Sequence, residues 1–204
     1  MGRRCFVRRP QSAAVRGFLL LATLFLAACG GGGGDGGDTL PCTTLVFDRA
    51  LANLADGDVY LDQASGTCST VGVTVLVNNL DSIWSASFDL SFPSSLLTYD
   101  SYTLGPLLQK GSPSTPPFVQ VAQVGGTVQV VMSRFAPDPP VNAVGSEALI
   151  TIRFRRIAAG SGAIDFDTSG TSLVGEVLLD DAIPVGSQLA ATFAPGHGGL
   201  VTVP

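Results

Sequence analysis

The sequence predicts an all-β protein built as an antiparallel β-sandwich, and three observations support this prediction. β-Branched and aromatic residues dominate stretches in which apolar and polar residues alternate. Glycine and proline, with 25 and 13 residues, separate these stretches at intervals of about 8–15 residues. No segment sustains the 3.6-residue apolar period of a long helix, and only Ala50–Ala55 is expected to form a short one.

Eight to ten strands are expected, each bounded by turn residues, glycine or proline. Asn78–Ser82 is rich in turn residues and is interpreted as a turn between two strands. Gly125 and Gly126 fit a two-residue hairpin turn, and Pro93 ends the strand before it. The expected strands are 59–63, 71–77, 83–92, 96–104, 118–124, 127–133, 148–156, 163–167, 173–179 and 199–203.

The segment Ile83–Phe92, IWSASFDLSF, shows the clearest alternation in the chain. From Trp84 onward its even-numbered residues are apolar and are expected to face the core, Trp84 included. Its odd-numbered residues are small and polar, as the outer side of a half-buried antiparallel strand requires. This outer side holds Ser85, Ser87, Asp89 and Ser91.

The start of the chain has the pattern of a secretory signal peptide. A leader with five arginines and no acidic residue precedes the apolar run Gly17–Leu26. As a helix this run is about 15 Å long, too short for a bilayer core of ~30 Å. The motif LAAC that ends at Cys29 resembles a bacterial lipobox. That resemblance implies cleavage before Cys29, lipidation of this residue and, because Gly30 follows it, export to the outer membrane.

The chain is expected to divide into a signal peptide (1–28), a lipidated cysteine with a glycine-rich tether (29–38) and one domain (39–204). Without the leader, six of the 11 basic residues and all 16 acidic residues remain, a formal net charge of 6 − 16 = −10. This charge argues against nucleic acid as a partner, because phosphate contacts need clustered lysine and arginine. The membrane is therefore expected as a partner only through the lipid anchor.

The four cysteines are expected to have different fates. Cys5 leaves with the signal peptide and Cys29 takes lipid. Cys42 and Cys68 remain as a pair in an oxidising compartment, so a disulfide is expected between them. It closes a loop of about 27 residues, which is worth roughly 3–4 kcal/mol in the chain-entropy model.

The sequence contains no recognisable catalytic constellation. His197 is the only histidine, lies in a glycine-rich stretch and is expected to be exposed. No G-x-S-x-G elbow is present, so we expect neither an enzyme nor a required cofactor. Three groups of acids could supply oxygen ligands to a structural Ca²⁺ ion or could equally be turn residues, and the sequence leaves both interpretations open. These groups are Asp56 with Asp58, Asp165 with Asp167, and Asp180 with Asp181.

Three stretches together resemble the cohesin modules, in the order and spacing of their features. They are VGVTVLVNNLDSIWSASFDLSFPSSLLTYDSYTLGPLL, GTVQVVMSRF and SEALITIRFRRIAAGSGAIDF, at residues 71–108, 126–135 and 146–166. The resemblance covers about 130 residues and implies a nine-stranded jelly-roll sandwich related to carbohydrate-binding modules. Phe92-Pro93-Ser94 stands where the family often has Tyr-Asp-Pro.

In cohesins the partner is a dockerin, a small Ca²⁺-loaded helical module, and one sheet face makes the contact. The resemblance therefore implies a non-enzymatic module that captures a protein partner, with Ser85, Ser87 and Asp89 as candidate contact residues. Two other functions stay open. The first is polysaccharide binding on the same fold, which needs exposed aromatic rings in line. The second is a structural role as an envelope lipoprotein without a specific ligand.

Overall fold

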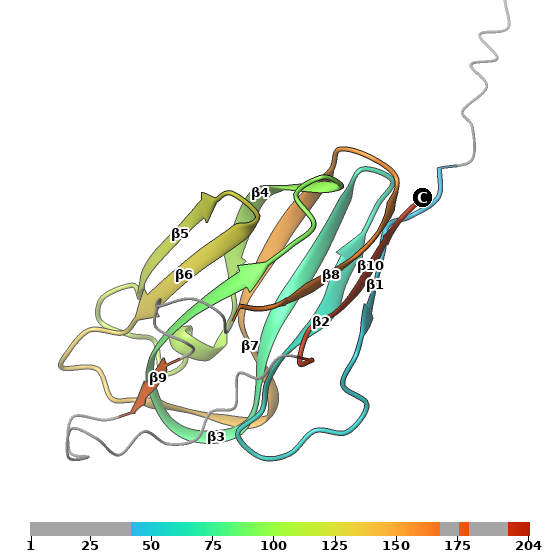
Figure 1. Cartoon of the computed structure of the whole chain (residues 1–204). Coiled ribbons are helices and arrows are strands. Elements are labelled where there is room, and N and C mark those ends of the chain that lie inside the picture. The colour runs from blue at the N-terminus through green and yellow to red at the C-terminus, as the bar shows by residue number, and fades with distance from the viewer. Residues whose placement is uncertain (1–41, 168–175, 180–195) are drawn as a thin grey trace, which may run out of the picture. The chain divides into compact units, whose positions relative to one another are not determined.

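The structure is a computed structural model that describes residues 42–167, 176–179 and 196–204. These residues form an antiparallel β-sandwich (Figure 1), which confirms the predicted fold class. The signal peptide, Cys29, the tether and the Asp180–Asp181 pair lie outside the described residues. The elements are β1 (Val46–Arg49), β2 (Val59–Gly66), β3 (Thr70–Ser91), β4 (Leu97–Leu104), the 3₁₀ helix η1 (Leu107–Gln109), β5 (Phe118–Val124), β6 (Thr127–Ser133), β7 (Val141–Arg156), β8 (Gly160–Phe166), β9 (Glu176–Leu179) and β10 (Gly199–Val203).

Strand β3 is shared by the two layers of the sandwich. Its C-terminal part, from Ser85 to Ser91, belongs to the front sheet, whose order is β5-β6-β3-β8-β10-β1, and β9 also pairs with this part. Its N-terminal part, from Thr70 to Asn78, belongs to the back sheet, whose order is β2-β3-β7-β4. One strand therefore supplies residues to both outer faces of the domain.

The crossing of β3 from one sheet to the other lies at residues 78–82, where the sequence predicted a turn. Asn79 has a positive φ of 43°, and the register with β7 shifts between Asn78 and Leu80 and again between Leu80 and Ile83. The side-chain amides of Asn78 and Asn79 donate to Ala55 O and Asp56 Oδ1, both at 2.8 Å. The predicted turn is wrong, because these turn-forming residues instead make bulges that bend a continuous strand.

Three further differences from the expected elements have simple causes. Ala50–Ala55 is not helical, since six residues are too few for a helix that buries no face, and the amide of Ala50 instead donates to Gly198 O at 2.9 Å. β1 is too short to show an alternating pattern in the sequence. β7 starts at Val141 rather than at Ala148, because its first residues pair with β3 at the bend.

One hydrophobic core lies between the two sheets. Phe88 of the front sheet and Phe154 of the back sheet are both at most 1% exposed. The ring of Phe92, just after β3, lies 5.1 Å from that of Phe154. The buried residues of this core run from Leu45 to Val203, so the compact unit Thr39–Pro204 contains all of it. This unit carries its own core and can be studied as a separate piece.

Cys42 and Cys68 form a disulfide, with their Cα atoms 5.4 Å apart, a usual separation for such a bond. Cys42 precedes β1, and Cys68 lies in the turn between β2 and β3. The disulfide therefore links the segment that leads into β1, at one edge of the front sheet, to the turn between β2 and β3. Both residues are exposed, so the bond constrains the chain without filling the core.

Candidate functional site

The outer surface of β3, β6 and β5 is a regular array of small and mostly uncharged side chains, which we call the front face. β3 pairs with β6, and β6 with β5, without a register shift over this region. Because paired residues point to the same side of a sheet, the outward residues form rows across the three strands. The four rows are Ser85, Ser133 and Phe118; Ser87, Val131 and Gln120; Asp89, Gln129 and Ala122; and Ser91, Thr127 and Val124.

The three contact candidates predicted from the sequence all lie on this array, in consecutive rows. Ser87 and Asp89 are partly exposed, but Ser85 is only 9% exposed. Ser85 therefore lies on the expected side of the strand but is largely covered. Ser85 pairs with Ser133 of β6 and with Leu178 of β9. A role of Ser87 and Asp89 in binding stays a prediction.

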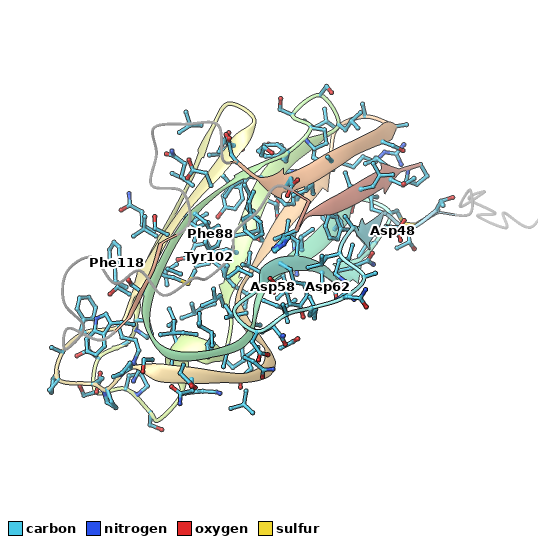
Figure 2. The ribbon with its side chains drawn as sticks, turned by 60° about the horizontal axis from the view of Figure 1, so that its bottom comes forward. Asp48, Asp58, Asp62, Phe88, Tyr102 and Phe118 are labelled. Atoms are coloured by element: carbon cyan, nitrogen blue, oxygen red, sulfur yellow. A yellow bond between two sulfur atoms is a disulfide. The ribbon has the colours of Figure 1, made fainter. Side chains whose placement is uncertain are left out.

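The front face also exposes three apolar side chains that the sequence analysis did not select. Phe118 and Val131 are each 43% exposed, and Val124 is 61% exposed. Figure 2 shows Phe118 at the outer side of the domain, on β5, and Phe88 within the sandwich. A signal for these residues was available, because the glycine-pair hairpin sets which residues of the two strands share a side.

The electrostatics of the front face are simple. Asp89 is the only charged residue in its four rows, and its Oδ2 accepts a hydrogen bond from Gln129 Nε2 at 3.3 Å. Three further acids stand beside the array at the other edge of β3. Glu176 of β9 pairs with Ser87, Asp165 of β8 pairs with Ser91, and the amide of Asp167 donates to Asp89 O at 2.9 Å. Asp48, Asp58 and Asp62 are on the opposite side of the domain from Phe118 (Figure 2). A partner that covers the four rows alone therefore desolvates one charged side chain.

The back face, which is the outer surface of β2, β3, β7 and β4, has the opposite character. Arg153 and Arg155 of β7 are exposed, and Arg155 Nε lies 3.9 Å from Asp100 Oδ1 on β4. Nearer the other edge, Arg49 of β1 pairs with Asp62 of β2 at 3.3 Å. These charges keep the back face hydrated, because removing paired charges from water costs free energy that their attraction seldom returns in full.

Trp84 does not lie in the core, contrary to the sequence-based expectation. It is partly exposed, whereas its neighbour Ile83 is fully buried. The register between β3 and β9 shifts between Ile83 and Ser85, so the regular alternation starts only after this point. Trp84 and Phe118 are the aromatic residues of β3 and β5 that retain exposure.

The residues considered for catalysis or metal binding have structural partners. His197 is half-buried rather than exposed, and its Nδ1 lies 3.0 Å from Val59 O. Asp165 accepts amide hydrogen bonds from Gly196 at 2.8 Å and Gly198 at 3.0 Å. Asp58 accepts one from Ala55 at 2.6 Å. Within the described ranges, no group of three or more His, Cys, Asp or Glu residues could hold a metal ion.

Comparison with solved structures finds cohesin modules. A non-cellulosomal cohesin from the archaeon Archaeoglobus fulgidus is 21% identical with a TM-score of 0.38, over 49% of this chain and 64% of that one, slightly under two thirds of its length. A type II cohesin from Acetivibrio cellulolyticus, solved in a complex with an X-dockerin, is 15% identical with a TM-score of 0.42, over 62% and 77%. A second type II cohesin module, from a scaffoldin of the same bacterium, is 15% identical with a TM-score of 0.42, over 62% and 70%.

No protein-family model and no curated protein matches the chain. Among the described residues, no helix has the length and apolar character needed to span a bilayer. The likenesses to these solved structures are distant, with TM-scores of 0.38 to 0.42.

Proposed function

We propose that residues 39–204 form a non-enzymatic binding module that captures a protein partner on the front face. The observation that carries this proposal is that exposed apolar side chains lie in an array with a single charged residue. Phe118 and Val131 are exposed in neighbouring rows, and Asp89 is the only charged member of the array. The centres of protein interfaces are similarly depleted in charge and enriched in apolar and aromatic residues.

The regular geometry of the front face favours a partner with a broad contact surface. Its side chains are short along β3, where Ser87 and Asp89 lie beside the larger Val131 and Gln120. Because the three strands pair without a bulge, a partner can lie across several rows. The sequence resemblance to cohesins implies that this partner is of dockerin type, a small helical module on another secreted protein.

We further propose that the module is held at the cell envelope, in the outer membrane, by lipid on Cys29. The sequence supports this through the LAAC motif, the preceding apolar run and the glycine-rich segment 30–38. A glycine-rich chain of nine residues has a root-mean-square reach of about 15–18 Å, enough to lift a domain off a bilayer surface. Replacing Cys29 with serine should release the protein from the membrane fraction, and unchanged membrane association would contradict the lipid anchor.

The proposed capture is tested with two pairs of introduced arginines on opposite faces. Ser87→Arg with Asp89→Arg places two long cations in the centre of the front face. Ser101→Arg with Thr103→Arg places two at exposed positions of β4, in the back sheet. The immobilised Thr39–Pro204 unit and both variants are incubated with purified dockerin modules and with secreted proteins of the source organism, and captured proteins are then titrated by calorimetry.

We expect the front-face pair to weaken capture by roughly 10- to 100-fold, or about 1.4–2.7 kcal/mol, because two charges must then be desolvated. The back-face pair should bind like the unmodified unit. Equal capture by all three proteins would exclude the front face. Retardation of the unit in polysaccharide gels, with no protein captured, would instead favour the carbohydrate-binding alternative.

A further inference from the structure

Strand β5 ends the front sheet and offers a free strand edge. It is the last strand in the sheet order, and among the described residues it pairs only with β6. Figure 1 shows it as the outermost strand on that side of the domain. A free edge exposes backbone N–H and C=O groups that can pair with another strand. Natural proteins therefore usually shorten, charge, bulge or cover such edges.

The edges at β4 and β1 carry this protection. The register of β4 shifts between Tyr99 and Ser101, and the charged Asp100 stands at this bulge. β1 has only four residues, and two of them are Asp48 and Arg49. A strand of another molecule would meet a charge and a bulge on β4, or charges on a very short strand at β1.

The edge at β2 is covered by other parts of the chain. The amide of Leu61 donates to His197 O at 2.9 Å, and His197 Nδ1 lies 3.0 Å from Val59 O. Further along, Gln63 Oε1 accepts a hydrogen bond from the amide of Phe47 at 2.7 Å. β2 also has a register shift between Gln63 and Ser65. Pairing with a further strand at this edge would require these contacts to break.

Within the described residues, β5 has none of these protections. Its sequence, FVQVAQV, contains no charge, no glycine and no proline, and it pairs with β6 without a register shift. The absence of charge extends through the whole segment from Gly111 to Ser133. Gln120 and Gln123 are exposed on opposite sides of the strand, and Phe118 and Val124 are exposed at its two ends. Seven uncharged residues of high β-propensity at an open edge favour strand addition.

We propose that β5 pairs antiparallel with β5 of a second copy of this chain, so that two front sheets join into one. The strand is self-complementary. With a two-fold axis at Val121, Phe118 meets Val124 of the other copy, Val119 meets Gln123, and Gln120 meets Ala122. Outward residues then lie opposite outward residues. No like charges meet, which is the usual obstacle when a strand pairs with itself.

This pairing also determines where the two front faces lie. A two-fold axis perpendicular to the sheet keeps the same surface of both copies on the same side. The exposed rings of Phe118 and the side chains of Val124 from the two copies then become neighbours at the centre of one continuous surface. A dimer would therefore present two capture faces side by side, which strengthens binding to a partner that carries two docking elements.

Sedimentation equilibrium of the Thr39–Pro204 unit, without any partner present, tests the self-pairing. We expect the average mass to rise about twofold with concentration, as a closed two-fold dimer requires. Gln120→Lys with Gln123→Lys places one lysine on each side of the edge and should raise the dissociation constant at least about tenfold. The control, Ser101→Lys with Thr103→Lys, adds the same charge to the β4 edge and should associate like the unmodified unit.

Hydrogen exchange locates the association surface. The amides of Phe118–Val124 should exchange more slowly as the concentration rises, while those of Leu97–Leu104 on β4 should not change. A unit that stays monomeric at every concentration, or a β5 lysine variant that associates as strongly as the β4 control, would overturn the proposal. The proposal would also be overturned if association slowed amide exchange in β4 or β1 and left exchange in β5 unchanged. Partner capture does not enter these readouts, so they remain informative even if the proposed function is wrong.

Discussion

The front and back faces of the sandwich share strand β3 but differ in charge. On the back face, Arg153 and Arg155 stand exposed on the central strand β7. On the front face, the equivalent central positions are Ser87, Val131 and Gln129, with Asp89 as the only charged residue of the array. Both faces rest on the same core, so neither packing nor strand geometry imposes this difference.

The comparison shows what a binding face needs beyond a stable sheet. Neutral, short side chains lose little hydration when a partner covers them, whereas paired arginines and acids lose much. Exposed apolar residues such as Val131 and Phe118 add favourable burial on contact, at about 25 cal/mol per Å² of apolar surface. The back face is therefore suited to remain in water, and the front face is suited to dock.

The largest expected effect comes from removing the disulfide. Cys42→Ser with Cys68→Ser should lower the free energy of unfolding by roughly 3–4 kcal/mol, because the bond closes a loop with a sequence separation of 26. Urea unfolding measures this change. Both cysteines are exposed and lie away from the front-face rows, so capture by the folded protein should not change. A tenfold loss of affinity in the folded variant would show that the two regions are coupled.

A charge in the middle of the front face should separate binding from stability. Val131→Asp replaces an exposed apolar side chain that lies beside Ser87 and Gln120. Capture should weaken by about 10-fold or more, while the free energy of unfolding changes by less than about 0.5 kcal/mol. Thr103→Asp on the back sheet is the matched control. Equal binding by both variants, measured by calorimetry, would remove the distinction between the faces.

The pH dependence of stability should come partly from Glu147 on β7. Burial acts to raise the pKa of Glu147, but the hydrogen bond and charge of Lys110, with the amide of Val144, outweigh it and lower the pKa below its ordinary value of 4.5. Because the folded pKa is the lower one, the stabilisation is present above about pH 4.5 and is lost as the pH falls through the folded pKa.

Lys110→Met removes the partner of Glu147 and should make the acid-side loss of stability shallower. Urea unfolding across the acidic range measures this slope. The variant should be less stable near neutral pH, and the two curves should converge at low pH. Parallel curves would mean that the Lys110–Glu147 pair does not contribute to the pH dependence.

The smallest effect is expected for the charges of the back face. Arg155→Gln removes an exposed ion pair with Asp100. Such pairs contribute about 0–1 kcal/mol, so we expect a change of less than about 0.5 kcal/mol in unfolding free energy and no change in capture. A substantial loss of binding in this variant would indicate that the back face takes part in docking.

The fold class could be predicted from the sequence because alternation is a local signal. The segment from Ala86 to Phe92 alternates as expected, and the residues that face the core are buried. The bend of β3 could not be predicted in the same way. Asn78 and Asn79 have the composition of a turn, and only their contacts with the loop at Ala55 and Asp56 make them a bulged corner. Trp84 was misplaced for a related reason, because the register shift beside it moves it out of the core.

The front face was predicted in part. The outward side of β3 was predicted correctly for Ser85, Ser87 and Asp89, but the alternation does not indicate that Ser85 is only 9% exposed. Val131 and Phe118 belong to the front face because β6 and β5 follow β3 in the sheet. A single sequence does not contain this strand order. For the same reason, the open edge at β5 can be recognised only once the sheet order is known.

The central claim is that the front face, and not the back face, binds the partner. The most direct test is an NMR titration of the Thr39–Pro204 unit with the captured protein. We expect chemical-shift changes and line broadening at Ser87, Gln129 and Val131, and none at Thr103 or Arg153. Changes centred on Thr103 and Arg153, with the front-face signals unmoved, would contradict the account.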